Sequence, residues 1–234
     1  MLSLLGALGR RMMGILYGAL NDEERARYLC EHPDEFAEKL TALLLGEAPP
    51  GFSGIAKAAV FYKRHFGLAK DFSSLHVPRK PPGDYWLLVV AEGLTPMMVF
   101  ARWQELGWGC WKSRDDLDSC IPKSDRKSDK DYAVWVKATQ EADEDLKKKS
   151  YEDLGDLGIF GNTLLERMLL EIQYNDETGD HLDKINATLC SGSRYPDGRV
   201  PFIYWDVEGR GLCIFGCGPR DCSDGLRSRA VVSS

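Results

Sequence analysis

Long hydrophobic runs and an excess of positive charge are both missing from this sequence of 234 residues. No apolar stretch approaches the roughly 20 residues that a helix needs to cross a bilayer, so we expect no membrane span. The formal net charge is −6. Without a global basic field to hold a phosphate backbone, we expect no nucleic-acid partner. Hydrophobic residues make up 44% and charged residues 28% of the chain, which predicts an ordered globular protein.

Secretory features are also lacking. Arg10 and Arg11 follow the apolar N-terminal run instead of preceding it, so we expect no signal peptide. The cysteines are odd in number and scattered, unlike a disulfide framework. The seven are Cys30, Cys110, Cys120, Cys190, Cys213, Cys217 and Cys222. We therefore expect a cytoplasmic location, where thiols stay reduced.

Metal-binding and catalytic motifs are absent as well. The four histidines fall in separate segments, and none has a histidine partner four residues away, as a zinc helix requires. Cys190 and Arg194 stand too close together for a phosphate-cradling loop. Gly216-Cys-Gly218 is followed by Pro219 rather than by a helix, so it is not a dinucleotide motif. We expect no catalytic residues, no cofactor and no enzymatic activity.

One alternative from a different class stays open. The C-terminal cysteines Cys190, Cys213, Cys217 and Cys222 could form a thiol or zinc site. Their spacing lacks the paired CxxC knuckles of structural zinc sites, so we expect no metal there.

Hydrophobic periodicity and breaks divide the chain into three parts and predict an α+β fold. We expect a helical N-terminal unit at 1–50, which includes an amphipathic helix at 2–20. An α/β segment should follow at 51–130, and a domain with a small antiparallel sheet at 131–234. Helical spacing predicts helices at 52–67, 95–106, 113–116, 138–157 and 163–178. Apolar or alternating runs predict strands at 85–91, 109–111, 132–136, 187–190, 200–206, 211–215 and 226–232.

The two strands at 200–206 and 211–215 carry a candidate binding surface. If Ile203, Trp205 and Ile214 face the interior, strand alternation turns their neighbours toward solvent. A register shifted by one residue would exchange the two faces. An exposed surface that mixes aromatic, thiol and charged groups is typical of a binding site. The candidate ligand-binding residues are Phe202, Tyr204, Asp206, Cys213, Phe215, Cys217, Arg220, Asp221, Cys222 and Ser223.

The C-terminal part resembles compact C-type-lectin-like folds of bacteria. The likeness covers about 131–234 and rests on three short stretches: Thr163-Leu-Leu-Glu166 at a helix start, Leu189-Cys-Ser-Gly-Ser-Arg194, and the terminal strand Leu226–Ser233. Within that group it is similar to the variable proteins of diversity-generating retroelements. The whole chain also resembles uncharacterised proteins of candidate-phylum bacteria.

The resemblance implies a fixed hydrophobic skeleton that displays outward positions near the C-terminus, diversified to bind different ligands. It does not imply sugar binding, because the tryptophan-rich core motifs and the calcium motif of true lectins are weak or missing here. We therefore expect a non-enzymatic module that binds a protein or small-molecule ligand through 199–224.

Overall fold

The computed structural model describes residues 54–233, which belong to one compact unit, Gly54–Ser234. The N-terminal helical unit predicted at 1–50, with its helix at 2–20, lies outside the described residues. Within 54–233 the chain is α+β, as predicted. No helix in this range is long and apolar enough to cross a membrane.

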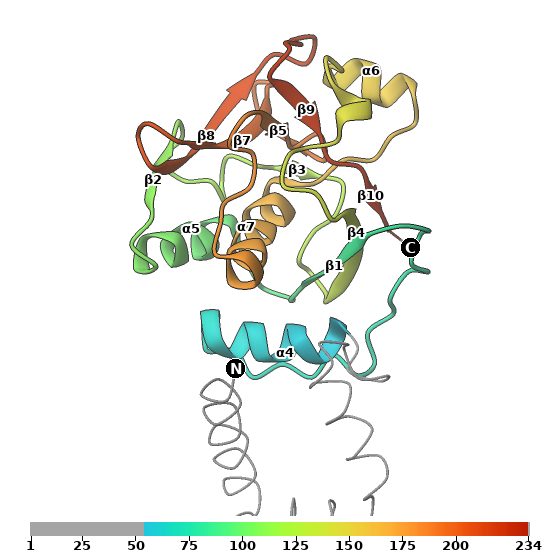
Figure 1. Cartoon of the computed structure of the whole chain (residues 1–234), viewed down its shortest axis with the longest axis vertical. Helices are drawn as coiled ribbons and strands as arrows, with labels where there is room; N and C mark the ends of the chain where they lie inside the picture. The colour runs from blue at the N-terminus through green and yellow to red at the C-terminus, as the bar shows by residue number, and fades with distance from the viewer. Residues whose placement is uncertain (1–53, 234) are drawn as a thin grey trace, which may run out of the picture. The chain divides into compact units, whose positions relative to one another are not determined.

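Within the described residues the helical elements all lie before residue 179, and the last six elements are all strands; Figure 1 labels most of them. The helical elements are α4 (Gly54–Phe66), α5 (Pro96–Glu105), η1 (Glu144–Leu146), α6 (Tyr151–Asp156) and α7 (Leu164–Thr178). The strands are β1 (Tyr85–Val90), β2 (Gly109–Lys112), β3 (Lys123–Ser124), β4 (Tyr132–Lys137), β5 (Ala187–Leu189), β6 (Ser193–Arg194), β7 (Val200–Asp206), β8 (Gly211–Cys217), β9 (Leu226–Ser228) and β10 (Val231–Val232).

The strands form three sheets, of which the largest is mixed. Its order is β2-β8-β7-β5-β9, and the other two sheets are β1-β4-β10 and β3-β6. Strands β8, β7 and β5 are antiparallel neighbours, but β2 runs parallel to β8 and β9 runs parallel to β5. The sequence predicted a small antiparallel sheet, but the sheet is mixed, because β2 and β9 join its two edges in parallel.

Strands on either side of residue 130 share the same sheets. Strand β1 pairs with β4, and β2 pairs with β8. The predicted boundary at residue 130 therefore does not separate two compact units. The predicted boundary at residue 50 lies near the division between Ser53 and Gly54.

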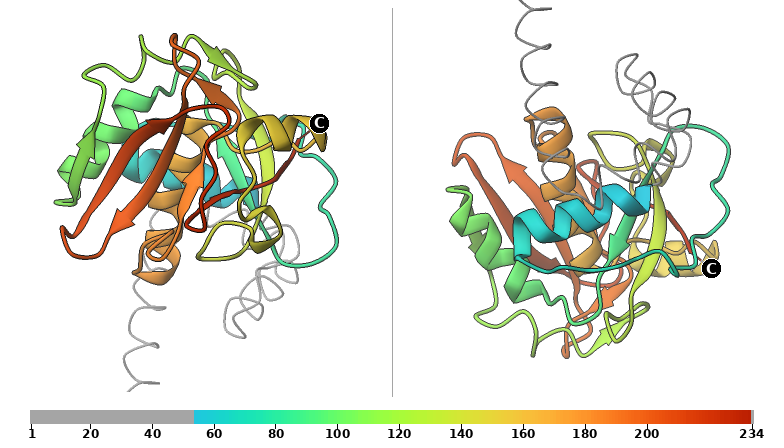
Figure 2. Two further views of the ribbon diagram at one scale, coloured as in Figure 1. Left: turned by 90° about the horizontal axis from the view of Figure 1, so that it is seen from above. Right: turned by 90° about the horizontal axis from the view of Figure 1, so that it is seen from below.

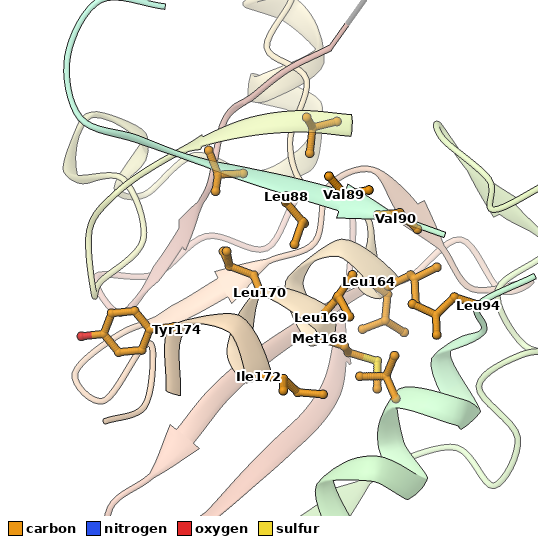
Figure 3. Close-up of a cluster of buried hydrophobic side chains, with 14 of the residues drawn as sticks. Leu88, Val89, Val90, Leu94, Leu164, Met168, Leu169, Leu170, Ile172 and Tyr174 are labelled. Carbon is orange, nitrogen blue, oxygen red and sulfur yellow. The ribbon is translucent and has the colours of Figure 1, made fainter. Parts of the chain in front are cut away.

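Helix α7 is the centre of the main hydrophobic core. It packs between β1 and the inner face of the five-stranded sheet, with α5 beside it (Figure 3). The helix begins with the capping box that the sequence predicts: the Thr163 hydroxyl accepts from the Glu166 N–H at 3.2 Å, and the Glu166 carboxylate accepts from the Thr163 N–H at 2.8 Å. It ends at Gly179, whose φ of 73° is left-handed, as expected of a C-terminal glycine.

Four buried charges stabilise the chain around the end of α7. Asp183 accepts from Arg167 Nε at 2.8 Å and from Arg229 Nη2 at 2.7 Å, and the second carboxylate, Glu171, accepts from Arg167 Nη1 at 2.8 Å. All four side chains are almost completely shielded from solvent. Two positive and two negative charges pair with one another, and their attraction offsets part of the desolvation cost of burying them.

The helix predicted at 138–157 is wrong over 138–149, because this network binds the backbone there, whereas α6 lies within the predicted continuation at 150–157. Arg229 donates to the carbonyl oxygens of Thr139 and Gln140, and Asp183 accepts a backbone N–H from the same segment. These buried side chains bond to backbone groups that a helix would pair with one another, and the segment follows a non-helical path. Only the short η1 is helical there.

The short helix predicted at 113–116 is also wrong. Ser113 N donates to the Ile214 carbonyl at 2.9 Å, which continues the β2–β8 ladder beyond the end of β2. The Lys112 ammonium then donates to the carbonyl oxygens of Arg114 and Asp115. The backbone is held in a bend instead of a helical turn.

Candidate functional site: an aromatic sheet face

Strands β7 and β8 separate their residues into an inner and an outer set. Ile203 and Ile214 are completely buried and pack in the main core. Their neighbours on the opposite side are only partly buried, and the register pairs Phe202 with Phe215 and Tyr204 with Cys213 across the two strands. This is the alternation predicted from the sequence, and not the register shifted by one residue.

One half of the outer face is covered. A second, smaller hydrophobic cluster lies there under η1 and α6, and Phe202 and Cys217 pack at its edge. Figure 2 (left) looks onto this face and shows α6 to one side of β7 and β8. The buried members of the cluster are Leu146, Leu154, Leu189, Val200 and Leu226.

The other half of the outer face is aromatic and partly exposed. We define the aromatic face as Trp111, Phe202, Tyr204, Cys213 and Phe215. The rings of Phe202, Tyr204 and Phe215 lie within 18° of parallel, with centroids 5.8 to 6.3 Å apart. The Trp111 ring lies 4.3 Å from the Phe215 ring and is 47% exposed. Except for Phe202, none of these side chains belongs to either hydrophobic cluster.

Trp111 is the member of this face that sequence reasoning missed. It lies on β2, beside Cys213 in the parallel β2–β8 ladder. The sequence indicates a strand at 109–111 but contains no local signal for its partner, since parallel pairing joins residues about a hundred positions apart. The tryptophan thus enters the site through tertiary structure alone.

The centre of the aromatic face carries no charge. Burial raises the pKa of the Tyr204 phenol and of the Cys213 thiol, so both groups are neutral at pH 7. The nearest predicted charged residue, Asp206, is at the hairpin end of β7, where its carboxylate accepts from the Glu208 N–H at 3.1 Å. An apolar centre with a polar rim is the usual layout of a recognition surface.

The remaining predicted site residues lie at the opposite end of β8. Cys217 ends the strand, and an exposed loop then carries Arg220, Asp221, Cys222 and Ser223. This loop runs beside α6: its Arg220 guanidinium donates to a carboxylate at the start of that helix, at 2.8 Å. Asp221 accepts a backbone N–H within the loop at 2.6 Å. The structure therefore brings the predicted residues to one side of the sheet, with the loop separated from Asp206 by the length of β8.

On the inner side of β7, Trp205 packs against other side chains at the hairpin end. The His181 ring stacks on the Trp205 ring with centroids 3.4 Å apart and planes 5° apart. His181 Nδ1 lies 2.9 Å from the buried carboxylate of Glu171, and Trp108 contacts the same imidazole edge-on. Trp205 is thus connected to the buried charges through His181, which stacks on its ring and contacts Glu171. Trp205 is partly buried and packs against the main core, in agreement with the inward orientation predicted from the sequence.

The C-terminal cysteines Cys190, Cys213, Cys217 and Cys222 are the alternative candidate, as a thiol or zinc site. Within residues 54–233 no group of three His, Cys, Asp or Glu side chains is arranged to hold a metal ion. Burial raises the pKa of Cys190 and Cys213, and raises that of Cys217 to about 11. Protonated thiols are poor nucleophiles and poor ligands.

Two pockets lie elsewhere, at the start of β4. Their volumes are about 310 and 430 Å³, and both are lined by Lys130 and Tyr132. Neither is lined by a predicted site residue. The candidate site is a sheet face that lies outside these two pockets.

Comparison with known proteins leaves this surface to be interpreted from its own geometry. No protein-family profile, curated protein or solved structure matches the chain.

Proposed function

We propose that this protein is a non-enzymatic binding module whose partner docks on the aromatic face. The observation that carries the proposal is the partly exposed half of the outer sheet face, where four aromatic rings stand together outside both hydrophobic clusters, except for Phe202 at the edge of the smaller one. Exposed aromatic clusters cost solvation free energy unless a partner covers them. Tyrosine and tryptophan are the residues that most often contribute large binding energies at interfaces.

The rigidity of the face also supports binding. The rings project from paired strands, and each contacts a neighbouring ring, so docking would immobilise few side chains. A preorganised surface loses less entropy on association than a flexible one. The ligand is a protein surface or a small molecule with an apolar centre, and Asp206, Arg220 and Asp221 would set its polarity at the two ends.

Photo-crosslinking in the native host tests the proposal. A photoreactive phenylalanine analogue replaces Trp111 or Phe215, and we expect it to yield a discrete crosslinked product. The matched control carries the same analogue at Phe160, which is 64% exposed and lies between α6 and α7. Equal crosslinking at Phe160 would contradict a specific site on the aromatic face.

Alanine variants add an energetic test. The double change Tyr204→Ala and Phe215→Ala should leave the fold intact and abolish the crosslink formed from Trp111. Circular dichroism and urea unfolding establish whether the variant is folded. If the double variant unfolds, both rings contribute to the core, and the proposal is wrong.

We further propose a C-type-lectin-like fold and diversification of the outward positions in 199–224. The support is the sequence resemblance together with the separation of inner from outer residues, which lets the outer set change without altering the core. Sequencing the gene's neighbourhood tests this. We expect a reverse-transcriptase gene and a near-copy of the last codons that differs mainly at template adenines; without them the chain is a generic binding module.

A cytoplasmic location also remains our proposal. The six cysteines within residues 54–233 are unpaired, which suits a reducing compartment. Fractionation of host cells, with detection of the protein in each fraction, would test it.

A further inference from the structure

A buried histidine connects helix α4 to two other helices. The His65 side chain is 1% exposed. Its Nε2 lies 2.6 Å from the Asp176 carboxylate of α7, and its Nδ1 lies 3.3 Å from Arg102 Nε of α5. Because the guanidinium can only donate, Nδ1 must accept, and the single ring proton is assigned to Nε2, facing Asp176. Figure 2 (right) shows α4 running across the underside of the molecule, over β1 and α7.

The charges around this imidazole balance only while the ring is neutral. Arg64 of α4 lies 3.3 Å from the Asp176 carboxylate, and Arg102 of α5 lies 2.9 Å from Glu105 on the same helix. These two arginines and two carboxylates cancel. A second ring proton would add an uncompensated positive charge and would point the Nδ1–H at the N–H of Arg102, which removes that hydrogen bond.

We propose that His65 is a proton-released clamp: mildly acidic pH protonates the ring and weakens the docking of α4 against α5 and α7. A further contact holds the helix on β1 independently of pH, since the Tyr62 hydroxyl donates to the Val89 carbonyl and accepts from the Ala91 N–H. The clamp therefore loosens the helix locally and does not unfold the protein.

The direction of the effect follows from linkage between protonation and docking. Burial, which outweighs the contact with Asp176, lowers the pKa of His65 below the ordinary value of about 6.5. As the pH falls, the imidazole of an undocked α4 therefore takes up a proton at a higher pH than the imidazole of a docked α4. Docking is strongest above the ordinary pKa and weakens as the pH falls below it, by at most about tenfold per pH unit, because one proton is involved.

Hydrogen–deuterium exchange of the full chain between pH 7.5 and 5.0 tests the clamp. After correction for the intrinsic exchange rate, we expect opening of residues 54–66 to increase toward pH 5.0 while residues 164–178 stay protected. In His65→Gln the amide can donate to Asp176 and accept from Arg102 but cannot titrate, so opening should become independent of pH. The exposed His76→Gln is the matched control and should keep the wild-type dependence.

Two results would overturn the proposal: opening of α4 that does not change with pH in the wild-type protein, or an unchanged dependence in His65→Gln. Should His65→Gln fail to fold, Arg102→Gln supplies a second test. Removing the positive charge next to Nδ1 makes protonation of the docked ring easier, so the pH dependence of opening should shrink. An equal or larger dependence in that variant would also contradict the clamp.

Discussion

Adjacent residues on β7 have opposite environments. Ile203 is completely buried against α7 in the main core, whereas Tyr204 belongs to the aromatic face and to neither hydrophobic cluster. One step along a strand turns the side chain to the other side of the sheet. The stability of the fold and the proposed binding surface are therefore carried by alternate residues of the same strand.

This separation predicts different costs for two neighbouring alanine substitutions. Ile203→Ala should lower the free energy of unfolding by about 2–5 kcal/mol, because it removes buried methylene and methyl groups and leaves a cavity. Tyr204→Ala should lower it by about 1 kcal/mol, near the centre of the distribution for single substitutions. Urea denaturation of both variants measures the difference. Equal costs would show that Tyr204 belongs to the core.

The buried carboxylate of Asp183 gives a prediction that depends on pH. Burial alone would raise its pKa, but the guanidiniums of Arg229 and Arg167 hold the pKa of Asp183 below its usual value. The folded state therefore keeps the charge at a pH where the unfolded state binds a proton. The resulting stability is complete above the ordinary value of about 4 and is lost as the pH falls through the lower, folded value.

Replacement of Asp183 by asparagine should cost about 3–5 kcal/mol at pH 7, because the buried Arg229 loses its carboxylate partner and Arg167 loses one of two. The difference between wild type and variant should shrink as the pH is lowered below about 4. Urea unfolding at pH 7, 5 and 3 measures both effects. The exposed Asp156→Asn is the control, with an expected change within about 0.5 kcal/mol. A cost that does not vary with pH would argue against a charged Asp183.

At the scale of elements, helix α7 organises the rest of the chain. Its inner residues fill the main core, its N-terminus is capped by Thr163 and Glu166, and Glu166 also accepts from Arg126 Nε at 2.6 Å. Arg126 belongs to the charged loop before β4 and also donates to the Gly161 carbonyl, so the capping residue Glu166 holds this loop against the start of α7. The capping box was predicted from its four-residue pattern, but the bond to Arg126 depends on a residue forty positions away.

Loss of the cap hydroxyl should destabilise the protein moderately. Thr163→Ala removes the acceptor for the Glu166 N–H inside the protein, and we expect a loss of about 1–2 kcal/mol in the free energy of unfolding. Thr163→Ser keeps the hydroxyl and should retain most of the stability. Thermal and urea unfolding of the pair measure this. A loss of the same size in the serine variant would assign the effect to the methyl group and not to the cap.

At the scale of the whole molecule, the unit Gly54–Ser234 depends on pairing between distant segments. β4 is paired with β1, and the edge of the large sheet at β8 is completed by β2. Residues 131–234 contain β4 and β8 but neither partner. The resemblance at 131–234 therefore covers only part of the compact unit.

Two fragments test this dependence. A fragment of residues 54–234 should fold alone and unfold in one cooperative transition, because it retains every strand pair and both hydrophobic clusters. A fragment of residues 131–234 should not fold, since the main core would lose α4, β1, α5 and β2. Circular dichroism and urea unfolding distinguish the two. A cooperative transition in the shorter fragment would show that residue 130 is a true domain boundary.

The sequence by itself determined the features that depend on neighbours along the chain. Strand alternation located Ile203 and Ile214 inside and Tyr204 and Phe215 outside, and the capping pattern located the start of α7, because both signals are periodic or local. Only the tertiary structure decided that β2 joins the large sheet in parallel and brings Trp111 to the aromatic face. It also decided that 138–149 is not helical, since Arg229 and Asp183 bind its backbone. Contacts between residues tens of positions apart leave no local pattern, so periodicity cannot predict them.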